Sequence, residues 1–110
     1  MNSFSDFAVA QSLSPLPVEW LSVRATPLQH QIRLDWSIIP NPQNAKFVIL
    51  KSLNGTEWSE AITVPAISDL VDYVWTDEDV NVNQRYFYQI RQVDYDGKTS
   101  YSIRILQKVN

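Results

Sequence analysis

Short runs in which hydrophobic and polar residues alternate follow one another along this chain. The clearest is 31–36, where Ile32, Leu34 and Trp36 fall on one face and polar residues on the other. Side chains of a β-strand point to opposite faces with a period of two, so this pattern predicts a half-buried strand. Similar runs predict further strands at 18–25, 45–51, 57–64, 72–76 and 101–109.

The longest aromatic and β-branched run, 86–97, ends in Asp96-Gly97, a strong hairpin signal, and predicts the central strand. Asn54-Gly55 predicts a second tight turn, of two residues. The run 18–25 places Leu21, Val23 and Ala25 on one face.

Seven short strands, turn signals between them and no helical pattern are typical of an immunoglobulin-like fold. The predicted fold class is all-β, an antiparallel two-sheet sandwich of seven strands. The expected centre of its core is Trp36, Tyr73, Trp75, Val80, Tyr86, Tyr88 and Ile90.

Charge and composition exclude several functions. The net charge is −3 with pI about 4.9 and no basic cluster, which argues against nucleic-acid binding. The chain has no cysteine, so thiol nucleophiles, disulfides and cysteine-based zinc sites are absent. No apolar run approaches the roughly 20 residues of a membrane-spanning helix, so membrane insertion is not expected.

Catalytic signals are missing as well. His30 is the one histidine, no carboxylate adjoins it, and there is no Gly-x-Ser-x-Gly nucleophile motif. Both glycines belong to predicted hairpin turns, so no phosphate-binding loop exists. We therefore expect no enzyme activity, no catalytic residue and no cofactor.

Acidic residues at the strand ends raise the question of calcium. Asp77-Glu78-Asp79 and the pair Asp94 and Asp96 supply oxygens, but neither group has the glycine-punctuated spacing of a calcium loop. Turn formation and solubility account for both groups, so no metal site is predicted.

Several landmarks resemble a fibronectin type III domain. An inward tryptophan, Trp36, lies on the second strand, and Val80 stands six residues before Tyr86, after which inward positions continue at Tyr88 and Ile90. The resemblance implies that Tyr86 forms a tyrosine corner, with its hydroxyl bonded to the turn backbone. It also implies a left-handed turn position at Asn83, a conformation that asparagine tolerates.

The chain is also similar to fibronectin-like modules near the C-terminus of large secreted and surface proteins of Bacteroidetes. Those modules begin Leu-Pro-Val-Glu-Leu-Leu-Ser-Phe, and residues 16–23 here are Leu-Pro-Val-Glu-Trp-Leu-Ser-Val. They continue Gln-Val-Asp-x-Asp-Gly and Tyr-Ser, found here at 92–97 and 101–102.

The resemblance implies an extracellular or cell-surface spacer, adhesion or presentation module, often placed before a type IX secretion sorting domain. Residues 15–110 would form the fibronectin type III-like domain. Residues 1–14 would be a linker or the last strand of an upstream domain.

One departure from these modules suggests an interaction face. Val48 and Leu50 stand where the family often has glutamate, and strand alternation points both outward beside Phe87 and Val93. Four large apolar side chains on one outer face would form a patch of the kind that binds a partner. Alternatively, a linker or the segment 4–9 of the same chain covers them.

Exposed aromatic rings would instead favour a sugar site. Trp20 and Tyr95 are the candidates for stacking on sugar rings, whereas core packing explains the other aromatics better. Two functions therefore stay open. One is a non-catalytic module that spaces, orients or docks neighbouring domains of the parent protein, or binds another protein. The other is a carbohydrate-binding accessory module of a secreted enzyme, with polysaccharide as its partner.

Overall fold

A computed structural model describes residues 18–110 and shows an all-β chain with two antiparallel sheets. No helix in this range is long and apolar enough to cross a membrane. The predicted fold class is confirmed, whereas the division at residues 1–14 lies outside the described residues. The strands are β1 (Glu19–Leu28), β2 (Gln31–Ile39), β3 (Asn44–Ser52), β4 (Ser59–Pro65), β5 (Asp72–Asp77), β6 (Arg85–Asp94), β7 (Thr99–Tyr101) and β8 (Ile105–Lys108).

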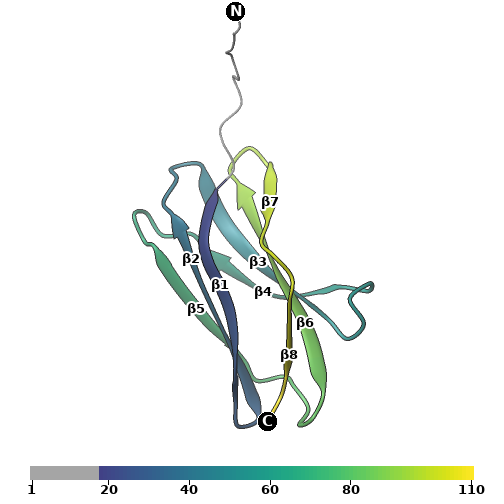
Figure 1. Cartoon of the computed structure of the whole chain (residues 1–110). Coiled ribbons are helices and arrows are strands. Elements are labelled where there is room, and N and C mark those ends of the chain that lie inside the picture. The colour runs from purple at the N-terminus through teal and green to yellow at the C-terminus, as the bar shows by residue number, and fades with distance from the viewer. Residues whose placement is uncertain (1–17) are drawn as a thin grey trace, which may run out of the picture.

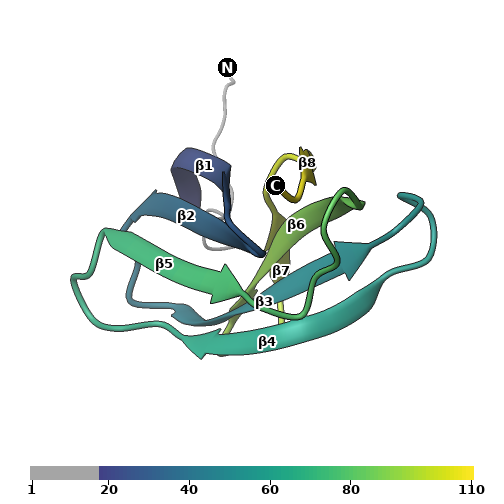
Figure 2. The same cartoon turned by 90° about the horizontal axis from the view of Figure 1, so that it is seen from below.

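The two sheets pack face to face as a sandwich (Figures 1 and 2). The smaller sheet has the order β1-β2-β5. The larger has the order β4-β3-β6-β7, and β8 continues along β6 beyond β7. Strands β5 and β4 are therefore edge strands of different sheets.

Aromatic rings join the two sheets at the centre. Trp36 on β2 stacks on Tyr73 of β5 with ring centroids 5.7 Å apart, and both rings meet Phe47 of the opposite sheet. Such pairs add to the burial energy of the rings. The predicted core is confirmed for Trp36, Tyr73, Tyr86, Tyr88 and Ile90, while Trp75 and Val80 pack on it half-buried.

The tyrosine corner implied by the family resemblance is present. The Tyr86 hydroxyl accepts a hydrogen bond of 2.8 Å from the backbone N–H of Asn81. Asn83 has φ of 67°, the left-handed conformation expected there. Its N–H donates to the carbonyl of Val109, so the corner also holds the C-terminal end of the chain.

The last predicted strand, 101–109, is wrong in its bounds, because the structure divides it into β7 and β8. The cause is Ser102, whose hydroxyl accepts the hydrogen bond of the Ile90 N–H at 2.9 Å in place of a backbone carbonyl. The Ser102 carbonyl accepts instead from the Gln89 side chain. A side chain that replaces a ladder partner interrupts the strand.

The two-residue turn predicted at Asn54-Gly55 is also wrong. A longer loop, 53–58, joins β3 to β4, and only Gly55 has a positive φ, of 80°. The side-chain oxygen of Asn54 accepts from the N–H groups of Thr56 and Glu57, each at 2.9 Å. Asparagine here organises a loop through its side chain rather than adopting the left-handed turn conformation.

The face predicted for Leu21 is wrong as well. The register between β1 and β2 shifts between Trp20 and Ser22, so Leu21 is the extra residue of a β-bulge and is 56% exposed. A bulge reverses the alternation of side chains on its two sides. Trp20 therefore packs on the core together with Val23 and Ala25.

The aromatic contact between the sheets predicts a large loss of stability in Trp36→Ala. The side chain is fully buried, and its removal leaves a cavity between Tyr73 and Phe47. We expect the free energy of unfolding in urea to fall by about 3–5 kcal/mol. Trp36→Phe is the matched control and should lose less stability. It keeps an aromatic ring in the core, and it removes an indole N–H that has no hydrogen-bond partner among the described residues. A loss below about 1 kcal/mol in the alanine variant would contradict this core.

Candidate functional site

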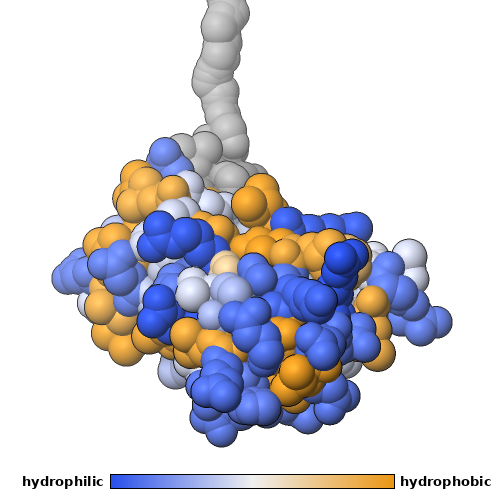
Figure 3. Space-filling model, turned by 60° about the horizontal axis from the view of Figure 1, so that its bottom comes forward, coloured by the Kyte–Doolittle hydropathy of each residue, from blue (hydrophilic) through white to orange (hydrophobic). Residues whose placement is uncertain are grey.

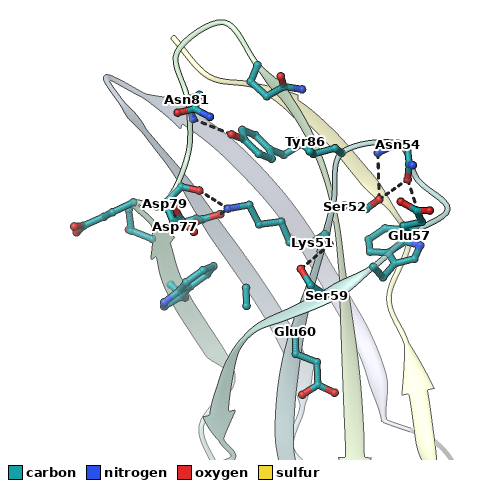
Figure 4. Close-up of a pocket in the computed structure, with 17 residues that line it drawn as sticks. Lys51, Ser52, Asn54, Glu57, Ser59, Glu60, Asp77, Asp79, Asn81 and Tyr86 are labelled. Atoms are coloured by element: carbon teal, nitrogen blue, oxygen red, sulfur yellow. Dashed lines mark hydrogen bonds and ion pairs between the residues drawn. The ribbon is translucent and has the colours of Figure 1, made fainter.

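A groove lies between the edge strands β5 and β4 of the two sheets (Figure 4). Its volume is about 940 Å³. One wall is the end of β5 with the residues that follow it, and the other is the start of β4 with the preceding loop. Its main lining side chains are Lys51, Trp58, Ser59, Trp75, Asp77 and Tyr86.

A polar cluster closes the inner end of this groove. The Lys51 ammonium, on β3, lies 2.8 Å from a carboxylate oxygen of Asp77, on β5. The same oxygen accepts a hydrogen bond of 2.6 Å from the hydroxyl of Tyr88, on β6. Lys51 also donates to the Asp79 carbonyl and lies over the Tyr86 ring, as Figure 4 shows. The cluster therefore links the two sheets as well as the strands β3 and β6.

Every group in this cluster is engaged. The second carboxylate oxygen of Asp77 accepts from the Asp79 N–H at 3.0 Å, and Asp77 is 2% exposed. Burial raises the pKa of the Tyr88 phenol well above its ordinary value, and the hydrogen bond to Asp77 and the charge of that carboxylate raise it further. The phenol thus stays protonated, and the cluster has no free acid or base.

The rim of the groove is acidic. Within residues 18–110, Glu57, Glu78 and Asp79 form no ion pair, whereas Glu60 is paired with Arg91 at 2.6 Å. In the same range, no group of three or more histidine, aspartate or glutamate side chains is placed to hold a metal ion. The carboxylate of Asp94, considered from sequence as a calcium ligand, accepts from the Gln92 amide at 2.7 Å.

Two tryptophans border the groove at different points. Trp75, on β5, is half-buried and packs on the core, and Trp58 is half-buried in the loop before β4. The guanidinium of Arg104 lies 5.4 Å from the Trp58 ring centre. Trp58 therefore packs outside the core, which corrects the expectation from sequence that core packing accounts for this tryptophan.

The predicted interaction face is on the outer side of the larger sheet, but half of it is buried. Val48 is 3% exposed and Leu50 is 9% exposed, so the expectation of an exposed patch is wrong for both. Val48 pairs with Arg91 and Leu50 pairs with Glu60. Because those two partners form an ion pair across β3, their long side chains cover the apolar ones.

The other two residues of that face, Phe87 and Val93, are half-buried. The loop 53–58 folds against Phe87, since a Cβ on Gly55 would lie 3.4 Å from its ring. Figure 3 shows hydrophobic atoms in separate patches bordered by hydrophilic ones on the face it draws. A partner for Phe87 and Val93 stays a prediction.

The two sugar-stacking candidates do not form a shared platform. Trp20 packs on Phe47 with ring centroids 6.1 Å apart, and its indole N–H donates to the Ser100 hydroxyl at 3.3 Å. Tyr95 follows β6 and is 73% exposed. The bulge at Leu21 turned Trp20 inward, so sequence alternation alone could not place it.

The groove and its cluster were missed from the sequence. A signal for the cluster was present, because Lys51 continues the inward positions Phe47 and Ile49, and a lysine in that phase needs a buried counter-charge. Its partner, Asp77, is distant in sequence, and only the packing of the two sheets brings them together.

The comparisons concern the fold. The chain matches no protein-family model and no curated protein. A fibronectin type III-like (Fn3-like) protein from Clostridium thermocellum superimposes with TM-score 0.63 at 17% identity, over 86% of this chain and 94% of that one. The likeness shows the fold alone: this chain is a fibronectin type III-like β-sandwich.

Two solved enzymes contain a similar fold in a small part of their length. The pectate lyase PelI from Erwinia chrysanthemi, solved with tetragalacturonic acid, gives TM-score 0.67 at 13% identity, over 84% of this chain and 28% of the enzyme. A β-1,2-glucanase from Parabacteroides distasonis gives 0.64 at 17% identity, over 84% of this chain and 13% of the enzyme.

The Tyr88 phenol predicts a decline of stability at alkaline pH. In the unfolded chain it ionises near pH 10, whereas the folded protein keeps its proton because the folded pKa is raised. Its contribution is therefore present below about pH 10 and is lost as pH rises further, at up to about 1.4 kcal/mol per pH unit.

Tyr88→Phe should lack this part of the decline when urea unfolding is followed from pH 8 to pH 11.5. At neutral pH the variant should be less stable by about 1.5–3 kcal/mol, since Asp77 loses a donor. If the free energy of unfolding falls equally steeply with alkaline pH in both proteins, the pKa of the Tyr88 phenol is not raised by folding.

Proposed function

We propose that this chain is a non-catalytic module that spaces and orients neighbouring domains of a larger secreted or cell-surface protein, or docks them. The fold supports a modular role, since similar sandwiches occur as a minor part of larger chains. The secreted or surface location, adhesion and the link to type IX secretion in Bacteroidetes are suggested by the motifs at 16–23 and 92–97.

The observation that carries the spacer role is the position of the chain ends. Strand β1 starts at Glu19 at one end of the sandwich and reaches the β1–β2 turn at the other (Figure 1). The carbonyl of Asn110 accepts from the N–H of His30 in that turn at 3.3 Å. Because β1 has ten residues, the chain enters and leaves about 30 Å apart.

The absence of catalysis is part of the proposal. Asp77, Lys51 and Tyr88 are held by one another, and their bonds connect the sheets. His30 has φ of 63° in an exposed turn, and its backbone serves to hold the C-terminus. Side chains used in this way support a rigid body with fixed ends.

A second candidate is a carbohydrate-binding accessory module. The observation in its favour is the groove, which has Trp58 and Trp75 on its border together with polar side chains that could bond to sugar hydroxyls. The two solved enzymes with a similar fold are a pectate lyase and a β-1,2-glucanase. The two candidates differ in oligosaccharide binding. A spacer binds no oligosaccharide, whereas an accessory module binds one, and the Trp58→Ala variant of such a module no longer does.

The spacer role predicts a fixed distance between the two ends. The chain has no cysteine, so Glu19→Cys with Lys108→Cys gives a single pair of spin labels at exposed positions. Pulsed electron paramagnetic resonance should show one narrow distance near about 30 Å, set by the length of β1.

The same distance should persist when a folded domain is fused to each end. A labelled pair that spans β6, Arg85→Cys at its start with Asp96→Cys in the turn after it, reports whether the sandwich itself is intact. A distribution that broadens or moves on fusion while the control pair stays unchanged would contradict a spacer.

A further inference from the structure

The edge strands of the two sheets, β1, β5, β4, β7 and β8, differ in how they are protected. An exposed edge carries unpaired N–H and C=O groups that can bind another strand, and proteins block it with proline, bulges, lysine or shortness. Strand β1 has a bulge at Leu21 and contains Pro27, and β4 has a register shift and ends at Pro65. Strand β7 has three residues, and β8 has four and ends in Lys108.

Strand β5 has none of these devices. It has six residues, contains no proline or lysine, and keeps a regular register along β2 from Ser37↔Asp72 to Ile32↔Asp77. Its centre, 73–76, is Tyr-Val-Trp-Thr, residue types that favour the extended conformation. Among the described strands, β5 alone is a regular edge open to pairing.

Space for a further strand lies beside this edge. The groove is lined by Trp75, Thr76 and Asp77 of β5 and by the start of β4, and no residue of β2 lines it. It therefore opens on the side of β5 away from β2. Along that edge, Val74 on the outer face is 59% exposed and Trp75 on the inner face is half-buried. Both can pack against side chains of an added strand.

The charges around the edge indicate what could bind. Glu57, Glu78 and Asp79 on the rim form no ion pair with another described residue, so flanking lysine or arginine would complement them. A second copy of this chain fits poorly. Antiparallel pairing of two β5 strands would place Asp72 beside Asp77, and parallel pairing would align each aspartate with its copy.

We propose that β5 binds an extended segment of a partner polypeptide as an additional strand, with alternating β-branched residues at its centre and lysine or arginine at its ends. Backbone hydrogen bonds along β5 would supply affinity, and the acidic rim would select the basic ends. The inference rests on the docking part of the proposed function and is independent of the spacer part.

Fluorescent heptapeptides of alternating valine and threonine between lysines are suitable probes. Fluorescence anisotropy should show saturable binding to the chain, weakened at least tenfold by Val74→Lys, which places a charge on the free edge. Thr63→Lys is the matched control, since it adds the same charge to an exposed position of the other edge strand, β4, and should bind within twofold of the original chain.

Peptides N-methylated on alternate amides test the binding mode. Peptides methylated on the amides that point away from β5 should still bind, and peptides methylated on the other amides should lose at least tenfold in affinity. The reason is that only every second N–H of a strand faces its neighbour. The proposal is overturned by absence of saturable binding, by equal loss in both methylated sets, or by equal loss in the two lysine variants. Binding of a neutral glucan oligosaccharide in place of the peptides would also overturn it and favour the second candidate. The spin-label distance between residues 19 and 108 should be unchanged in Val74→Lys. Loss of peptide binding in this variant can then be distinguished from a failure of the spacer role.

Discussion

The structure depends on the contact between the two sheets through Trp36, Phe47 and Tyr73. Each sheet exposes one face to solvent, so the inner faces are stable only when they bury each other. Two of these rings belong to the smaller sheet, and Phe47 of the larger one meets both at centroid distances of 5.6 Å and 4.8 Å. This contact fixes the distance between the edge strands β5 and β4, and therefore the groove between them. The positions of the chain ends follow from the same packing.

Polar side chains close the apolar core at its two ends. Lys51 and Asp77 join the sheets beside the groove. Further along the larger sheet, the buried amide of Gln92 donates to Asn44 at 2.9 Å as well as to the adjacent aspartate. Buried polar groups are costly unless they are paired, so these clusters favour one arrangement of the strands over its alternatives. Each of these groups is therefore part of the packing that holds the strands together.

Alternation along the sequence predicted the sandwich and most of its core, because every second side chain of a half-buried strand points to the buried face. It failed where the backbone departs from a regular ladder. The bulge at Leu21 reversed the faces around it, the hydroxyl of Ser102 divided the last strand, and the side chain of Asn54 built a loop in place of a tight turn. The groove escaped sequence reasoning for another reason, because its walls come from different sheets and only tertiary packing brings them together.

These features describe a rigid sandwich in which one strand edge is left free. Amide hydrogen exchange measured by NMR in the chain without a partner tests this claim most directly. Every second amide of β5 should exchange nearly as fast as in an unfolded peptide, while the amides of β2, β3 and β6, which have neighbours on both sides, exchange only with global unfolding. Slow exchange at every amide of β5 would show that this edge is already covered, and it would contradict the account.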